Sequence, residues 1–315
     1  LRNYNHISSI GDENYGIYAS GPVQNYGNIN FSAGVGNVGM YSYVKGATTT
    51  PGLMENFGRI DVSASDLSDP DNRKYGIGMA AGFSEEDPIG SGIKVVRGLG
   101  NIKNSGTISV TTGNSIGMYG SGTGTVVENN GRIELSGTER NIGMFIEEGA
   151  TGINNGVITT VGSGNKKQIG IAATSGSTLW NNGSIHIDAE TGYGLLISGA
   201  IVRNYGTMNI TVGSGATPIK EVEAADMTKT MGDAGLDQIK INAPAGVSNA
   251  TITLNGVVQT PVLANVQAIP NRMPNDIPTS SVGMYIDTSG INYTRPISNI
   301  GALAGLDEAD LIIGT

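Results

Sequence analysis

The residues that could carry acid–base or nucleophilic chemistry are few in this chain of 315 residues. It contains no cysteine and only two histidines, His6 and His186. A Cys–His pair is therefore impossible, and a serine triad would depend on one of these two histidines. Neither histidine has neighbours at the spacing of zinc ligands, and neither a P-loop nor an HExxH motif occurs. We expect both histidines to be solvated strand residues.

Carboxylates gather in two irregular stretches. The segment "DLSDPDN" contains Asp66, Asp69 and Asp71, and the next irregular segment contains Glu85, Glu86 and Asp87. Oxygen ligands of this kind could bind Ca²⁺, but their spacing matches neither an EF-hand nor a calcium-binding nonapeptide repeat. The sequence therefore favours acidic, solvated loops, and it predicts no metal site and no cofactor.

A column of carboxylates along one strand face would indicate a polysaccharide lyase or hydrolase. Glu147 and Glu148 lie near an expected corner of the chain, but the equivalent positions in neighbouring repeats are Ser121 and Thr174. We therefore predict no catalytic residue and no enzymatic activity. A carbohydrate-active enzyme remains an alternative.

An Asn-x-Gly motif, followed two residues later by an apolar residue, dominates the sequence. Its asparagines are Asn25, Asn56, Asn104, Asn129, Asn154, Asn181 and Asn204, and its glycines are Gly27, Gly58, Gly106, Gly131, Gly156, Gly183 and Gly206. The last five glycines, at 106, 131, 156, 183 and 206, are separated by steps of 25, 25, 27 and 23 residues. Short apolar–polar alternations between these motifs predict strands. A period in the twenties that is made of strands is typical of a solenoid.

Each repeat predicts three short strands, and equivalent strands stack in a parallel β-helix. A second motif, as in "VGMY" at Gly39 and "YGIG" at Gly76, marks one strand of each repeat. The stacking predicts two inward columns of side chains. These are Ile133, Ile158, Ile185 and Met208, and Met118, Met144, Ile171 and Leu195.

The repeated motif has a structural interpretation. Gly is expected to supply a left-handed corner, and the first repeat has Asn5 at this place, a residue type that tolerates such a backbone. The motif asparagines are expected to hydrogen-bond to one another in a ladder along the stack.

Composition narrows the class of protein. Gly accounts for 49 residues and the net charge is −9, with a pI near 4.7. So many glycines with a regular spread of apolar residues indicate many tight turns. The acidic balance disfavours nucleic acid and anionic membranes as partners. No apolar run is long enough for a membrane-spanning helix, and the absence of cysteine is compatible with export.

Three stretches interrupt the period. Residues 63–75 and 82–100 are interpreted as long corner loops, where solenoids often place binding specificity. Residues 213–280 are interpreted as an inserted subdomain or degenerate coils, with a short helix around 222–231 and a hairpin at Asn255-Gly256. The expected domains are thus β-helix repeats at 1–212, the interruption at 213–280, and the last coils with a C-terminal segment at 281–315.

The repeats and the closing stretch "VGMYIDTSGINYTRPISNIGALAGLDEADLIIGT" resemble the passenger domains of large type V autotransporter adhesins, particularly fusobacterial ones. The resemblance implies an all-β, right-handed, single-stranded parallel β-helix on the bacterial cell surface. It further implies type V secretion, with the chain cleaved from or tethered through an outer-membrane barrel that this sequence lacks, and a role in virulence. We therefore expect a fragment of a longer chain.

The expected function is attachment of a monomeric shaft to a protein or glycan receptor on host cells or other bacteria. The long loops at 63–75 and 82–100 or the 213–280 stretch would meet the receptor. Tyr41, Tyr43 and Tyr119 could be exposed platforms for glycans or members of a stacked ladder. The alternative is a structural spacer whose binding head lies elsewhere in a longer protein.

Overall fold

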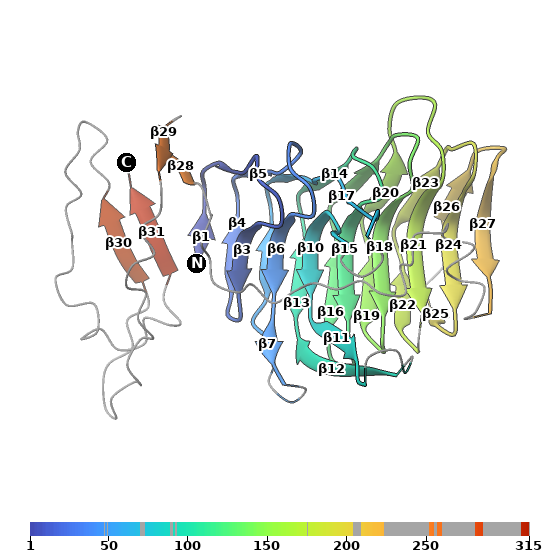
Figure 1. The fold of residues 1–315 in the computed structure, drawn as a ribbon, viewed down its shortest axis with the longest axis horizontal. Coiled ribbons are helices and arrows are strands. Elements are labelled where there is room, and N and C mark those ends of the chain that lie inside the picture. Colours follow the sequence, from blue (N-terminus) through green and yellow to red (C-terminus); the bar gives the residue numbers. More distant parts are fainter. Residues whose placement is uncertain are drawn as a thin grey trace.

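The computed structural model describes residues 1–223 except 47, 49, 70–72, 89–90, 92, 175 and 204–208. It also describes the backbone of 252–254, 257–259, 281–285 and 310–314. Strands from successive coils form three parallel sheets that run along one rod (Figure 1). Eight coils contribute one strand to each sheet, so the predicted all-β parallel β-helix with three strands per coil is confirmed. No helix occurs in the described part of the chain, and hence none there could span a membrane.

The first sheet consists of β1 (Arg2–Asn3), β4 (Val23–Asn25), β8 (Met54–Asn56), β13 (Asn101–Asn104), β16 (Val126–Asn129), β19 (Thr151–Asn154), β22 (Thr178–Asn181) and β25 (Ile201–Arg203). The second consists of β2 (Ile7–Ser8), β5 (Asn28–Asn30), β9 (Arg59–Asp61), β14 (Thr107–Val110), β17 (Arg132–Leu135), β20 (Val157–Thr160), β23 (Ser184–Ile187) and β26 (Asn209–Val212). The third consists of β3 (Tyr15–Ala19), β6 (Val38–Ser42), β10 (Ile77–Ala81), β15 (Ile116–Ser121), β18 (Asn141–Glu147), β21 (Gln168–Thr174), β24 (Gly192–Ser198) and β27 (Ala216–Glu221).

Apolar side chains that alternate along each strand fill the interior of the rod. Ile108, Ile133, Ile158 and Ile185 pair in register along the second sheet and are buried. Met118, Met144, Ile171 and Leu195 do the same along the third. These columns confirm the predicted period, because a strand shifted by one residue would turn its apolar side chains to the solvent.

The register differs from the prediction at two places. The residue paired with Ile185 in the last coil is Ile210 rather than Met208. The step from Ile201 to Asn209 is two residues longer than the step between the positions with which they pair, Thr178 and Ser184. Met208 itself lies outside the described residues. In the third coil, the glycine aligned with Gly39 is Gly78 rather than Gly76, since Ile77 pairs with Val38 and Met79 with Met40.

The motif glycines do not adopt the left-handed backbone that we predicted. The described ones, from Gly27 to Gly183, are not among the residues with positive φ. Their constraint is instead the close approach of successive coils. A Cβ on Gly131 would lie 2.1 Å from the carbonyl oxygen of Gly106, and one on Gly27 would lie 1.9 Å from that of Asn5. Asn5, which stands at the same place in the first coil, is exposed and has no positive φ either.

The motif asparagines form a continuous row of side-chain hydrogen bonds inside the corner between the first and second sheets. Each Nδ2 donates to the Oδ1 of the next coil, as from Asn104 to Asn129 and from Asn129 to Asn154, both at 2.9 Å. The row runs through Asn3, Asn25, Asn56, Asn104, Asn129, Asn154 and Asn181. Asn204 and Gly206, the predicted next members, lie outside the described residues.

The interruptions at 63–75 and 82–100 lengthen the chain between two neighbouring coils but do not form a coil of their own. Gly58 and Gly106, on either side of them, still stack directly on each other. Residues 82–100, which we predicted to be a loop, contain β11 (Phe83–Glu86) and β12 (Lys94–Leu99), an antiparallel hairpin. β12 also pairs with β7 (Val44–Lys45), so the three strands make a small sheet at the lower edge of the rod in Figure 1. We call β11 and β12 the side hairpin. The stretch 63–75 lies between β9 and β10.

The third sheet continues into the stretch 213–280, for which degenerate coils were one of the two expectations. β27 pairs in parallel with β24 and extends the third sheet to Glu221. The predicted hairpin around Asn255-Gly256 is confirmed by antiparallel pairing of β28 (Ile252–Leu254) with β29 (Val257–Gln259), and β28 also pairs with β2. β30 (Ser281–Tyr285) and β31 (Asp310–Gly314) pair in parallel. The helix expected at 222–231 lies mostly outside the described residues.

The outward face of the third sheet is apolar and buried. Tyr41, Tyr119 and Phe145 are among its largest buried side chains, and Val38, Ile77 and Ile116 line it as well. Tyr41 and Tyr119 therefore cannot act as exposed glycan platforms. Tyr41 belongs instead to a group of contacting rings with Tyr15, Tyr18 and Tyr43, and Tyr119 contacts Phe145.

Candidate functional site

The side hairpin is the largest described departure from the coil pattern, and it lies against the corner that follows β15. Gly122 at this corner has a φ of +101°, and a Cβ there would lie 2.8 Å from a methyl group of Val96 in β12. A Cβ on Gly124 would lie 3.1 Å from Leu99 in the same strand. Small residues at the corner thus allow β12 to pack directly on the rod.

A buried charged pair joins the hairpin to the rod. Lys94 Nζ at the start of β12 lies 2.8 Å from Glu147 Oε2 at the end of β18, and the two side chains are only 14% and 2% exposed. The Tyr119 hydroxyl donates to the other carboxylate oxygen at 2.5 Å. Burial raises the pKa of the Glu147 carboxyl above its ordinary value, although Lys94 and Tyr119 act in the opposite direction. Removing either charge would leave the other buried without its partner.

Neutral hydrogen bonds fix the first strand of the hairpin. The Ser121 hydroxyl donates to Ser84 Oγ at 2.7 Å, and both residues are buried. The Tyr41 hydroxyl donates to the Gly82 carbonyl at 3.2 Å, and the Gly82 amide donates to the Ser42 carbonyl. Both strands of the hairpin are therefore attached to the rod.

The solvent side of the hairpin carries charge and one large apolar side chain. Arg97 lies 2.6 Å from Glu85 and 2.5 Å from Asp87, and all three side chains are partly exposed. Ile93, just before β12, is exposed. An arginine flanked by carboxylates beside an exposed isoleucine suits contact with a protein surface.

The carboxylates considered for Ca²⁺ are engaged by protein groups. Glu85 and Asp87 pair with Arg97, and Asp66 accepts the Ser68 amide at 2.9 Å. Among the described residues no three His, Cys, Asp or Glu side chains are grouped closely enough to hold a metal ion. Asp71 and the Glu86 side chain lie outside the described part.

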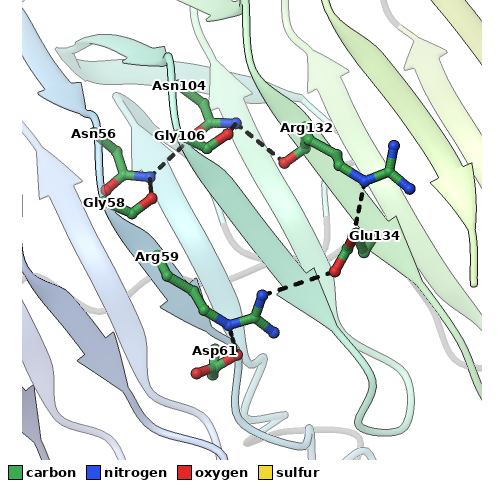
Figure 2. A network of polar contacts seen from close by, with 8 residues as sticks. All are labelled: Asn56, Gly58, Arg59, Asp61, Asn104, Gly106, Arg132 and Glu134. Carbon is green, nitrogen blue, oxygen red and sulfur yellow. Dashed lines mark hydrogen bonds and ion pairs between the residues drawn. The ribbon is translucent and has the colours of Figure 1, made fainter.

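The outward face of the second sheet carries a charge network rather than a row of free carboxylates. Arg59 pairs with Asp61 and Arg132 with Glu134, both at 2.8 Å. Arg59 also reaches Glu134 at 3.8 Å, past the intervening coil (Figure 2). Each carboxylate in this network faces a guanidinium group and is engaged in an ion pair.

The remaining candidates for chemistry have structural surroundings. His186 is exposed and its Nδ1 lies 2.7 Å from Thr211 Oγ1, and His6 is exposed in the first coil. The stretch "GNSIG" at 113–117 has the GxSxG spacing of a nucleophile elbow. Its serine, Ser115, is buried with Oγ 2.7 Å from the Ser63 carbonyl, and a strand follows it rather than a helix.

The sequence pointed to Glu147 and, in another role, to Tyr119, but it did not bring the two together and it did not point to Lys94. Lys94 and Tyr119 are 53 and 28 residues away along the chain. The available signal was the strand-like alternation of "GIKVVRGLG", which could have predicted a strand at this place instead of a loop.

Comparison with known proteins matches residues 2–156 to the family described as the BigA third pectate lyase-like domain. The matched part covers the first five coils and the first strand of the sixth, and the side hairpin lies within it. No curated protein and no solved structure matches the chain. The match supports a β-helical domain of a bacterial surface protein.

Proposed function

We propose that this chain is a β-helical shaft of a bacterial surface adhesin that attaches to a protein on host cells or neighbouring bacteria through its side hairpin. The observation that carries the proposal is the anchoring of the hairpin. A buried ion pair at the end of the strands next to the tip and a buried hydroxyl contact nearer the base hold the hairpin on the rod, while its charged and apolar tip is exposed. A preorganised element of this kind loses little conformational entropy on binding.

The assignment to an autotransporter passenger, with a position outside the outer membrane, belongs to the same proposal. Two observations support it: the similarity to a BigA domain and the repeated coils that extend the chain into a rod. A rod of stacked coils would hold its side hairpin at a distance from the membrane to which the rod is attached.

Attachment can be tested by shortening only the tip of the hairpin. Glu86 pairs with Lys94, so residues 87–93 can be replaced by Asn-Gly, which forms a tight two-residue turn. We expect the labelled wild-type chain to bind bacterial or epithelial cells, and the shortened variant to bind about tenfold more weakly or not at all. Asp61→Asn on the second sheet serves as a control and should bind like wild type. Unchanged binding by the shortened variant would place the contact on another part of the chain, and no binding by the wild type would leave the chain as a spacer.

Polysaccharide cleavage is the second candidate function, because the matched family is described as pectate lyase-like. The test is incubation with polygalacturonate and neutral polysaccharides, followed by measurement of reducing ends and of the absorbance of unsaturated products. The proposal of an adhesin shaft predicts no turnover. Turnover that is lost on substitution of Glu134 or Asp61 would establish the enzyme instead.

A further inference from the structure

The middle residue of each Asn-x-Gly motif lies outermost at the corner between the first and second sheets, and together these residues form one line along the rod. We call this line the corner row. Its described members are Tyr4, Tyr26, Phe57, Ser105, Asn130, Asn155 and Asn182. The row is aromatic in the first three coils and polar in the next four.

The aromatic half is a stack of exposed rings. Tyr4 and Tyr26 are parallel to within 8° with ring centroids 5.0 Å apart, and Tyr26 and Phe57 to within 4° at 4.8 Å. All three side chains are exposed although they are large and apolar. The stack stops at Phe57, since the next member is the small Ser105, and the ring face of Phe57 toward the fourth coil has no aromatic neighbour in the row.

The polar half borders a groove of about 660 Å³. The floor of the groove is made by the bare backbone of Gly106, Gly131, Gly156 and Gly183, positions where the stacking of the coils leaves no space for a side chain. Its walls carry side-chain amides and hydroxyls from Ser105, Thr107, Asn130, Asn155, Asn182 and Ser184. The glycines that allow the coils to stack therefore also leave the groove open at these positions.

The chemistry of the groove is that of neutral hydrogen-bonding groups at regular intervals. Asn155 donates to Asn130 and Asn182 donates to Asn155, both at 2.9 Å, so the amides are preordered. Arg132 lines the groove, but its guanidinium group pairs with Glu134. The ligand would thus meet amides and hydroxyls without an excess of charge.

The backbone of the groove is unavailable for pairing with an added peptide strand. The amides of Gly131, Val157 and Ser184 donate to carbonyls of the preceding coil at 2.8–2.9 Å. Recognition therefore depends on side chains alone. A chain of sugar rings fits this arrangement, because its hydroxyls bond to amides while its apolar ring faces pack on aromatic side chains.

We propose that the corner row binds a neutral polysaccharide chain lying along the axis of the rod. The sugar hydroxyls contact the asparagines of the groove, and one sugar ring packs on the uncovered face of Phe57. The corner row and the side hairpin are different parts of the surface, so this proposal stands or falls independently of receptor binding by the hairpin.

The test is affinity electrophoresis of the intact chain in gels containing a soluble neutral β-glucan or a neutral mannan, with polygalacturonate as the acidic comparator. We expect retardation by at least one neutral polysaccharide. Phe57→Ser and Asn155→Ala should each weaken that binding by about tenfold. Both residues lie at the surface, and circular dichroism verifies that the variants fold.

Matched controls decide whether the corner row is responsible. Tyr18 on the third sheet is 40% exposed, against 39% for Phe57, and Asn30 lies on the second sheet outside the groove lining. Tyr18→Ser and Asn30→Ala should bind like wild type. The proposal is overturned if neither neutral polysaccharide binds, if only polygalacturonate binds, or if the controls lose as much affinity as the two corner-row variants.

Discussion

At the scale of single residues, the Asn-x-Gly motif combines two structural constraints with one position that is free to vary. The asparagine supplies one donor and one acceptor to a buried row along the rod, and the glycine lets the backbone of one coil contact that of the preceding coil. The middle residue faces the solvent and is free to vary, from Tyr26 to Ser105 to Asn155. The motif therefore fixes the packing of the corner and leaves its outer surface available for recognition.

The glycine constraint predicts a large loss of stability for Gly131→Ala. The added Cβ would lie 2.1 Å from a backbone oxygen that the stacked coils hold in place, so relief requires separation of two coils. We expect the free energy of unfolding in urea to fall by about 3 kcal/mol. Gly21→Ala is the control, because a Cβ there meets no atom within 4 Å and the φ of Gly21 is not positive. A similar small effect of both variants would refute the close-approach explanation.

The buried row of amides predicts a difference between adjacent asparagines. Asn129→Ala would remove the acceptor of Asn104 and the donor to Asn154 in a buried environment, at a cost of about 2–4 kcal/mol of folding free energy. Asn130→Ala, next in sequence but at the surface, should change stability by less than about 1 kcal/mol. Thermal unfolding of the two variants measures the difference, and equal midpoints would contradict a stabilising role of the row.

At the scale of elements, the sequence predicts strands better than it predicts what joins them. The repeat determined the three strands of each coil, because an apolar residue at every second position leaves one face that must be buried. Residues 82–100 were wrongly predicted to be a loop. The two strands of the side hairpin are short and lie close to its polar tip, so they do not stand out as strands in the sequence. The repeat predicted no separate strand at 216–221, since Pro218 in β27 stands opposite the motif glycine Gly194 of β24, and β27 is recognised only by its pairing with β24.

The candidate site was likewise predictable only in part from the sequence. Glu147 is conspicuous as a carboxylate near the end of a strand, but its role depends on Lys94, which the fold brings from the side hairpin. The exposed rings of the corner row were also hidden, because Tyr4, Tyr26 and Phe57 are spaced by 22 and 31 residues and align only when the coils stack. Because the coils differ in length, residues that contact one another across coils are not separated by a constant number of residues, and sequence spacing alone does not reveal the contact.

The anchor of the hairpin predicts a particular pH dependence. Burial raises the folded-state pKa of Glu147 above its ordinary value of 4.5, so protonation favours the folded chain. This contribution is fully present below about pH 4.5 and is lost as the pH rises through the folded-state value. Relative to Glu147→Gln, which has no carboxyl to titrate, the wild type should therefore lose stability between pH 4.5 and neutral pH. Thermal midpoints of both proteins across this range test the sign, and a relative gain by the wild type with rising pH would contradict it.

At the scale of the whole molecule, a repetitive rod carries a small number of irregular elements. The eight coils bury a continuous apolar interior and use their backbone groups to stack on one another, so most of the chain is committed to building the shaft. The side hairpin departs from the coil pattern and is nevertheless held by buried contacts. This contrast is the physical basis for assigning support to the coils and attachment to the hairpin.

The most direct test of that assignment is photo-crosslinking of the intact chain on the surface of cells that it binds. A benzophenone amino acid is introduced at Ser91, on the tip of the side hairpin, or at Ser32, an exposed residue of the second coil. The account predicts a covalent adduct with a surface protein from the Ser91 position and little or none from Ser32. Adducts from Ser32 alone, equal adducts from both positions, or no adduct from Ser91 on cells that bind the chain would contradict it.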